Sequence, residues 1–263
     1  MEHIEVSGLD IAFRRAGHGP ALVLLHGGMC DSRIWRPQLE SLVDEFTVVA
    51  WDAPGCGGSS DPPDSYRLPD YADCLAGLID ALGLDRPHVL GHSFGAGLAL
   101  ALYGRRPTLP RSLVVVAGYA GWAGSLPAEE VQARLELAIR LASELPKPVT
   151  PDSLPGLFAS APPAGHLAEL AAVMSDVRAV GTRVMAHAFA DADLRDLLPQ
   201  ITVPTLILHG DADERAPRAV WERLHADIPD SALVLLSGVG HEVVIEAPDA
   251  FDTEVRRFLA NVP

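Results

Sequence analysis

The sequence predicts an α/β fold: a doubly wound, mostly parallel eight-stranded sheet flanked by helices, with a helical cap inserted after the sixth strand. Short apolar runs alternate along the chain with segments of helical periodicity, as parallel strands covered by helices require. One stretch, residues 118–200, interrupts this alternation with helical patterns alone. The chain has 263 residues, 48% of them hydrophobic, which is enough to build the core of such a fold.

The chain begins with a pattern typical of a β-hairpin. Ile4, Val6, Ile11 and Phe13 alternate with other residues on either side of a turn at Ser7–Asp10. We therefore expect the first 14 residues to form two paired strands.

Six apolar runs follow, and each is expected to be a strand buried on both faces. They are rich in leucine and β-branched residues and lack polar alternation. The runs are Ala21–Leu25, Thr47–Trp51, His88–Leu90, Leu113–Ala117, Thr205–Leu208 and Leu233–Leu236. Helical spacing of the apolar residues predicts helices over Arg33–Leu42, Tyr71–Leu82, Phe94–Tyr103, Ala219–His225 and Asp249–Leu259.

Residues 118–200 are expected to form a helical cap on the carboxyl edge of the sheet, inserted into a core domain of residues 1–117 and 201–263. One helical face is marked by apolar residues spaced three and four apart, namely Val131, Leu135, Ala138, Ala142 and Leu145. A stretch rich in helix breakers follows at 146–156, and more helical pattern runs from His166 to Phe189. Because ligands of such sheets bind beyond the strand carboxyl ends, the cap is either a lid over a site or a set of packing helices.

The charge balance argues against two classes of partner. Lys and Arg number 20 against 35 Asp and Glu, giving a formal net charge of −15, which repels nucleic-acid phosphates and anionic lipid headgroups. We therefore expect neither a nucleic-acid partner nor a membrane partner. The apolar runs are also far shorter than the ~20 residues that span a bilayer.

The cysteines and the start of the chain favour a reducing compartment. Cys30, Cys56 and Cys74 are odd in number and form no CxxC pair, so neither a disulfide framework nor a zinc knuckle is indicated. The first ten residues carry acids where a signal peptide needs basic and apolar residues. We expect a soluble, cytoplasmic protein, and no feature of the sequence indicates its oligomeric state.

The strongest local signal is Gly91-His92-Ser93-Phe94-Gly95, which lies between a predicted strand and a predicted helix rich in small residues. A serine on such a sharp strand-to-helix turn needs very small neighbours two positions away, and Gly91 and Gly95 meet this need. The turn presents the Ser93 hydroxyl at a helix N-terminus, where free N–H groups favour developing negative charge. Ser93 is therefore the candidate nucleophile.

A serine hydroxyl needs a base to accept its proton, and ten histidines are available. His26, His92 and His209 stand at strand ends beside glycines and are expected to be satisfied structural groups. His241 closes the glycine-rich loop Ser237–His241 directly after the last predicted strand. That loop lies on the same sheet edge as the serine turn, so His241 is the candidate base.

Two aspartates compete as the acid that orients the base, since both follow the predicted strand Thr205–Leu208. Asp211 comes directly after a turn glycine, where aspartate often caps its own backbone. Asp213 lies further into the loop and is better placed to reach across, so it is the predicted acid. The same loop does not fit calcium, because the required sixth-position glycine is Ala216 and Pro217 follows. We expect no metal.

Ser93, Asp213 and His241, in that chain order, resemble the catalytic triad of the α/β-hydrolase family. Three further segments resemble family motifs: LVLLHGG at 22–28, WDAPGCGGS at 51–59 and HGDADERAP at 209–217. They resemble, respectively, the strand and turn of the oxyanion loop, the D-x-x-G-x-G-x-S turn and the acid loop. The resemblance covers nearly the whole chain outside residues 118–200.

The resemblance also implies an oxyanion hole made by the backbone N–H groups of Gly28 and Phe94. Substrate contacts are expected from Trp122, which follows a strand at the active edge, and from Met29 beside the oxyanion loop. The implied chemistry needs neither a metal nor an organic cofactor.

The implied function is that of a serine hydrolase that cleaves a small to medium carboxylic ester or lactone through an acyl-enzyme on Ser93. Haloalkane dehalogenases and epoxide hydrolases of this family carry aspartate at the turn, and its carbon–carbon bond hydrolases usually carry tryptophan where Glu242 stands here. Both options are therefore disfavoured. A cofactor-free lyase or oxygenase, a perhydrolase and a non-catalytic ligand receptor remain as alternatives.

Overall fold

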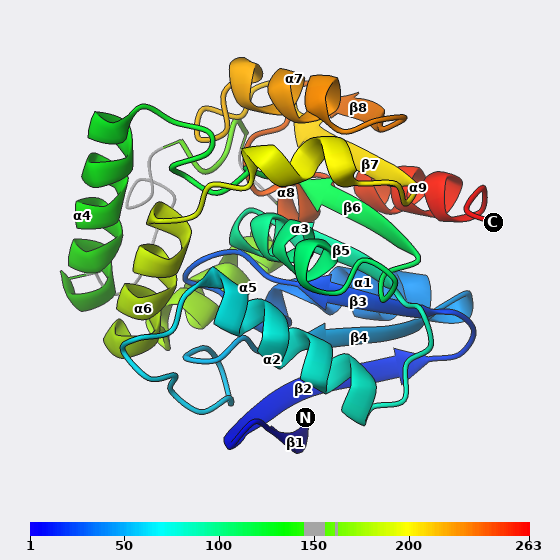
Figure 1. Ribbon diagram of the computed structural model, residues 1–263, viewed down its shortest axis with the longest axis horizontal. Helices are drawn as coiled ribbons and strands as arrows, with labels where there is room; N and C mark the ends of the chain where they lie inside the picture. The colour runs from blue at the N-terminus through cyan, green and yellow to red at the C-terminus, as the bar shows by residue number, and fades with distance from the viewer. Residues whose placement is uncertain (145–155, 161–162) are drawn as a thin grey trace.

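A computed structural model describes residues 1–144, 156–160 and 163–263. Its strands are β1 (Glu2–Val6), β2 (Leu9–Gly17), β3 (Ala21–Leu25), β4 (Thr47–Trp51), β5 (His88–His92), β6 (Ser112–Val116), β7 (Thr205–Gly210) and β8 (Ala232–Leu236). They form one sheet in the order β1-β2-β4-β3-β5-β6-β7-β8 (Figure 1). Only the β1–β2 and β2–β4 pairs are antiparallel, so the predicted eight-stranded, mostly parallel sheet is confirmed.

The expected hairpin is formed by β1 and β2, but it is longer than the first 14 residues. Ser7 and Gly8 make the turn with φ angles of 53° and 82°, a conformation that matches the twist of a two-residue hairpin. β2 continues to Gly17 because its second half pairs with β4.

Helices cover both faces of the sheet. The first face carries α2 (Leu68–Ala81), α3 (Phe94–Arg105) and α7 (Arg218–Asp227), and the second carries η1 (Ser32–Trp35), α1 (Arg36–Ser41), α8 (Val243–Glu246) and α9 (Pro248–Leu259). Strand β6 shows the division, since Leu113 and Val115 belong to the first core and Val114 and Val116 to the second. In Figure 1, α2 and α3 lie in front of the sheet and α1 lies behind it.

Two elements differ from the prediction. β8 is an edge strand and is only partly buried, with Leu235 41% exposed, so the expectation that 233–236 is buried on both faces is wrong. The helix expected over 33–42 is divided into η1, α1 and η2 (Leu42–Asp44). Pro37 stands in the first turn of α1, where its missing N–H starts a helix more easily than it continues one.

Between β6 and β7 the described residues form α4 (Ala128–Glu144), α5 (Ala164–Ser175), α6 (Ala179–Ala190) and η4 (Arg195–Gln200). The helical pattern of 166–189 is thus two helices. α4 and α6 lie side by side at one end of the molecule (Figure 1). The breaker-rich stretch 146–156 lies outside the described residues except for Gly156. Among the helices described, none has both the length and the apolar content needed to cross a bilayer.

Candidate active site

Ser93 lies on the predicted turn between β5 and α3, in a backbone conformation that L-residues rarely adopt, with φ 54° and ψ −111°. The turn is too tight for side chains at the flanking glycines. A Cβ on Gly91 would lie 2.0 Å from the Gly95 carbonyl oxygen, and one on Gly95 would lie 2.2 Å from the Leu25 carbonyl oxygen. These close backbone contacts hold Ser93 at the carboxyl end of β5.

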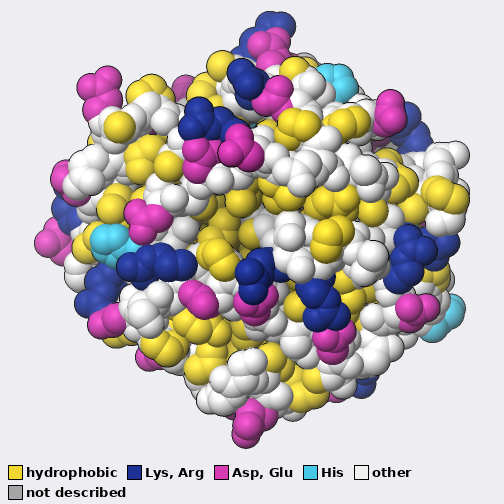
Figure 2. Space-filling view, viewed as in Figure 1, with side chains coloured by type: hydrophobic (Ala, Val, Ile, Leu, Met, Phe, Trp, Pro, Cys, Tyr) yellow, Lys and Arg dark blue, Asp and Glu magenta, His cyan; other side chains and the backbone are white. Residues whose placement is uncertain are grey.

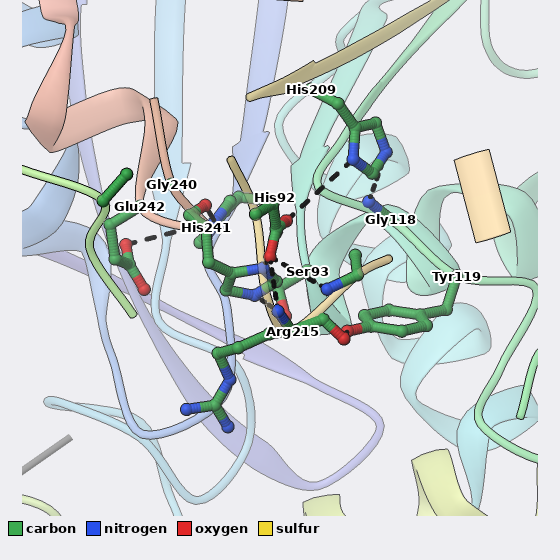
Figure 3. Close-up of polar contacts among 12 residues, drawn as sticks. His92, Ser93, Gly118, Tyr119, His209, Arg215, Gly240, His241 and Glu242 are labelled. Atoms are coloured by element: carbon green, nitrogen blue, oxygen red, sulfur yellow. Dashed lines mark hydrogen bonds and ion pairs between the residues drawn. The ribbon is translucent and has the colours of Figure 1, made fainter. Parts of the chain in front are cut away.

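The three residues predicted for the site come together at this edge of the sheet, and Figure 3 shows Ser93 next to His241. Nε2 of His241, from the loop after β8, lies 3.0 Å from Oγ of Ser93. Nδ1 of His241 lies 2.8 Å from Oδ2 of Asp213, from the loop after β7. Because a carboxylate only accepts, Nδ1 carries the hydrogen, which leaves Nε2 free to accept the Ser93 hydroxyl proton.

Asp213 is buried and fully engaged. While Oδ2 accepts from His241, Oδ1 accepts from the backbone N–H groups of Arg215 at 2.8 Å and Ala216 at 2.9 Å. Burial by itself raises the pKa of Asp213, but the charge and hydrogen bond of His241 and the Ala216 N–H outweigh it, so the pKa is lowered. The group is therefore kept as an anion that can stabilise an imidazolium.

Asp211, the competing acid, lies elsewhere in the loop. Its Oδ1 accepts the Gly238 N–H at 2.6 Å, so it joins the loop after β7 to the loop after β8. This differs from the expected cap on its own backbone. It is Asp213 that binds its own loop, through Oδ1, as well as the histidine.

The main chain of His241 is fixed from two sides. Its N–H donates to the Leu157 carbonyl at 3.0 Å, and its carbonyl oxygen accepts from Nε2 of His92 at 2.9 Å. Leu157 belongs to the segment between β6 and β7, so this segment contributes to the position of the candidate base.

Of the three other histidines at strand ends, only His26 has hydrogen-bond partners for both ring nitrogens among the described residues. Nδ1 of His26 donates to the Gly27 carbonyl at 2.8 Å, and its Nε2 accepts from the Ala53 N–H at 3.0 Å. His92 and His209 each use Nε2 but leave a buried Nδ1 without a hydrogen-bond partner, so the expectation holds for His26 alone. Burial lowers the pKa of all three, that of His209 to about 3, and keeps them neutral.

Two backbone N–H groups are available beside Ser93. Those of Gly28 and Phe94 have no acceptor within the part of the chain that the structure describes, and both residues line the same cavity as Ser93. A Cβ on Gly28 would meet nothing within 4 Å, so there is open space beside this amide. The next residue, Met29, has a φ of 60°.

A largely apolar cavity opens over Ser93. Its wall includes both residues expected to contact the substrate, Met29 and Trp122. Other side chains come from the helices between β6 and β7 and from Leu157, namely Ala138, Leu141, Leu157, Met174, Thr182, Met185, Ala186 and Phe189. The cavity therefore lies between the carboxyl edge of the sheet and these helices.

Three residues near the site are not identified by sequence reasoning as part of it. The hydroxyl of Tyr119 donates to the Arg215 carbonyl, and the tyrosine ring centroid lies 6.5 Å from that of His241 (Figure 3). Arg215 and Glu242 line the cavity. The available signals were weak: Tyr119 stands three residues after β6, and Glu242 directly follows the predicted base.

The acidic loops do not form a metal site with the histidines. Across residues 1–144, 156–160 and 163–263, no three His, Cys, Asp or Glu side chains are grouped as the ligands of a metal ion.

Comparison with known proteins agrees with this architecture. A family model described as the alpha/beta hydrolase family matches residues 22–254, so the chain belongs to the α/β-hydrolase family. The chain is 26% identical to the 2-(acetamidomethylene)succinate hydrolase of Mesorhizobium japonicum, over 97% of this chain and 94% of that protein.

Two solved structures are also similar. A thermophilic esterase from Thermogutta terrifontis, solved with malate bound, is 26% identical with a TM-score of 0.88, covering 100% of this chain and 99% of that one. The enol-lactonase from Burkholderia xenovorans LB400 is 27% identical with a TM-score of 0.83, covering 99% of this chain and 100% of that one. These relatives are hydrolases, which supports hydrolase activity on a small molecule.

Proposed function

We propose that the protein is a serine hydrolase that cleaves a small to medium carboxylic ester or lactone through an acyl-enzyme on Ser93. The observation that carries this proposal is the continuous hydrogen-bonded chain from Ser93 through His241 to Asp213. It lies against a largely apolar cavity, together with two backbone N–H groups that have no acceptor among the described residues.

In the first half of the reaction, His241 Nε2 takes the Ser93 proton as Oγ attacks the substrate carbonyl carbon. Asp213 holds the imidazole in the required tautomer and stabilises the imidazolium. The N–H groups of Gly28 and Phe94 bind the oxyanion of the tetrahedral intermediate. The imidazolium then gives its proton to the leaving alkoxide, and the acyl group remains on Ser93.

In the second half, His241 removes a proton from water as the water attacks the acyl-enzyme carbonyl. The same N–H groups bind the second oxyanion. Collapse of this intermediate returns the proton to Ser93 and releases the acid. In a lactone the released alcohol and acid belong to one molecule.

The cavity wall supports a modest, mostly apolar substrate. Met29 and Trp122 are placed to contact it, together with side chains of α4, α5 and α6. We include in the proposal that residues 118–200 act as a lid over the core domain of residues 1–117 and 201–263. A cavity wall built largely from these helices supports that role.

The proposal is tested with p-nitrophenyl acetate and p-nitrophenyl butanoate. Wild-type protein should release nitrophenol with a burst of about one equivalent when acylation is faster than deacylation. Ser93→Ala should lower kcat/KM by at least about a thousandfold, because the nucleophile is removed. The variant's circular dichroism and unfolding midpoint are measured as the control for folding.

Equal rates in wild type and Ser93→Ala would refute the nucleophile. Proton-transfer chemistry without an acyl-enzyme would give turnover of a different substrate and no burst with an activated ester. Tight binding of small esters without turnover would favour the receptor alternative.

A further inference from the structure

One carboxylate oxygen in the cavity, Oε2 of Glu242, has no hydrogen-bond partner among the described residues. Glu242 lines the same cavity as Ser93, and its side chain is only 6% exposed. Oε2 itself is buried. A buried acceptor without a donor costs free energy, and a ligand that brings a donor to this carboxylate would recover that free energy.

His92 lies close to the Glu242 carboxylate, but it does not supply that donor. Nε2 of His92 is 4.0 Å from Oε2 of Glu242 and donates instead to the carbonyl of His241 (Figure 3). Burial lowers the pKa of His92 and keeps the ring neutral, so its one N–H is already used. The remaining Nδ1 is an acceptor and faces Gly27.

The rest of the cavity wall is mainly apolar. Met29, Leu157 and Phe189 carry no side-chain donor. Trp122, Thr182 and Arg215 carry donors and line the same cavity, but among the described residues none of them forms a hydrogen bond or ion pair with Glu242. A buried acceptor in a mainly apolar wall fixes the orientation of a ligand that carries a matching donor, and it disfavours a ligand of the same shape that lacks one.

We propose that Glu242 accepts a hydrogen bond from a hydroxyl or ammonium group of the substrate, next to the ester bond that Ser93 attacks. The preferred substrate class is then a donor-bearing ester or lactone and not a plain hydrocarbon ester. This inference rests on the proposed function, because it names the substrate of the same site.

The test compares substrates that differ in one terminal group. For the acyl half these are the p-nitrophenyl esters of butanoate, 3-hydroxypropanoate and 3-aminopropanoate, which end in methyl, hydroxyl and ammonium. For the alcohol half they are propyl butanoate and 2-hydroxyethyl butanoate. Wild type should favour a donor-bearing ester of one series over its methyl counterpart by about tenfold or more in kcat/KM.

Glu242→Leu removes the acceptor and replaces it with an apolar side chain. The ratio of kcat/KM for the donor-bearing ester to kcat/KM for its methyl counterpart should therefore fall at least about tenfold. Glu242→Gln keeps a neutral acceptor, so it should retain part of a hydroxyl preference and lose an ammonium preference. Glu214→Gln removes an exposed carboxylate from the loop after β7 and should leave the ratio unchanged. Ratios are compared because a loss of folded protein lowers both rates equally.

A binding measurement separates this inference from the proposed function. In Ser93→Ala, methyl 3-hydroxypropanoate should bind more tightly than methyl butanoate in calorimetry, and adding Glu242→Leu should remove the difference. If esters are hydrolysed but neither series shows a ratio that depends on Glu242, the inference is overturned and the proposed function stands. If no ester is hydrolysed, the proposed function fails, and the binding comparison still decides whether Glu242 selects a donor.

Discussion

The two oxygens of the Asp213 carboxylate perform different tasks. Oδ1 is held by the N–H groups of Arg215 and Ala216, which fixes the carboxylate within its loop, and Oδ2 holds the imidazole of His241. Asp211 makes neither contact and joins two loops through Gly238. Substituting Asp213 should therefore disturb the orientation of His241, whereas substituting Asp211 should disturb only the contact between the two loops.

Asp213→Asn should lower kcat/KM for p-nitrophenyl butanoate by roughly a thousandfold to ten-thousandfold, because an amide can hold the imidazole in the wrong tautomer. Asp211→Asn should cost no more than a few-fold, since an amide oxygen can still accept the Gly238 N–H. Initial rates at pH 8 measure both. A larger loss in Asp211→Asn than in Asp213→Asn would show that the wrong acid has been assigned.

At the residue scale, what the sequence predicts depends on where each residue stands relative to a strand end. Ser93, Asp213 and His241 each follow a recognisable strand, and the carboxyl ends of parallel strands share one edge. Glu242 and Tyr119 also stand near strand ends. Their contributions depend on side-chain direction and on burial by helices distant in sequence, which a local pattern does not contain.

Between elements, the helical segment meets the sheet domain in a close backbone contact at two glycines. A Cβ on Gly181 in α6 would lie 2.0 Å from the Gly55 carbonyl oxygen, and one on Gly55 would lie 2.5 Å from the Gly181 Cα. α6 therefore lies directly against the loop that follows β4. The same helix supplies Thr182, Met185 and Phe189 to the cavity wall.

Gly181→Ala should push α6 away from this loop, lower stability by about 1–3 kcal/mol through overpacking, and raise KM for p-nitrophenyl butanoate several-fold. Gly165→Ala in α5 is the matched control, because a Cβ there would meet nothing within 4 Å. It should change stability by less than about 1 kcal/mol and leave KM unchanged. Urea unfolding and steady-state kinetics measure both effects. An unchanged KM in Gly181→Ala would mean that α6 does not set the cavity.

The pattern of apolar residues predicts the bounds and burial of a strand well when both of its faces are covered along its whole length. It predicts them poorly when burial changes along the strand or helix. The central strands β3 and β4 have the predicted bounds because both faces are covered. β8 has a similar composition but stands at the sheet edge, and a local pattern of leucines does not reveal that position. The break between α5 and α6 likewise reflects packing and not a strong breaker.

For the molecule as a whole, buried neutral histidines link stability to pH. Burial lowers the pKa of His88 to about 4 and that of His209 to about 3. The unfolded chain then binds protons below pH ~6.5 that the folded chain does not, so stability falls as pH decreases from that value towards the folded pKa. The lowered pKa of Asp213 acts in the same direction at more acidic pH, below the ~3.9 of an unfolded aspartate.

His88→Gln should reduce the dependence of stability on pH, because it removes a titratable side chain that is buried at the start of β5 and hydrogen-bonded to the Ser112 hydroxyl. Between pH 7 and pH 5, the free energy of unfolding should fall by roughly 1–2 kcal/mol less in the variant than in wild type. Urea denaturation at the two pH values gives the comparison. The same fall in both proteins would contradict the assignment of His88 as a neutral, proton-linked group.

The acidic side chains on the face shown in Figure 2 do not form one continuous negative patch, although the chain carries a formal net charge of −15. Figure 2 shows basic and acidic side chains next to each other there, with apolar side chains between them. Exposed ion pairs in the structure include Arg105 with Asp73 at 2.7 Å and Arg183 with Asp64 at 2.7 Å. Exposed pairs of this kind add little stability individually, so the excess of acids influences which partners approach more than how the chain folds.

The three free cysteines give the fold a built-in reporter of local opening. Cys30, Cys56 and Cys74 are all buried, and burial raises the pKa of each thiol, so alkylating reagents reach them only when the surrounding structure separates. Cys56 directly follows Gly55, the residue on which α6 rests. The rate at which Cys56 is labelled would therefore report how often α6 moves away from this loop. The labelling rate of Cys74, in the middle of α2, would report unfolding of a larger part of the structure.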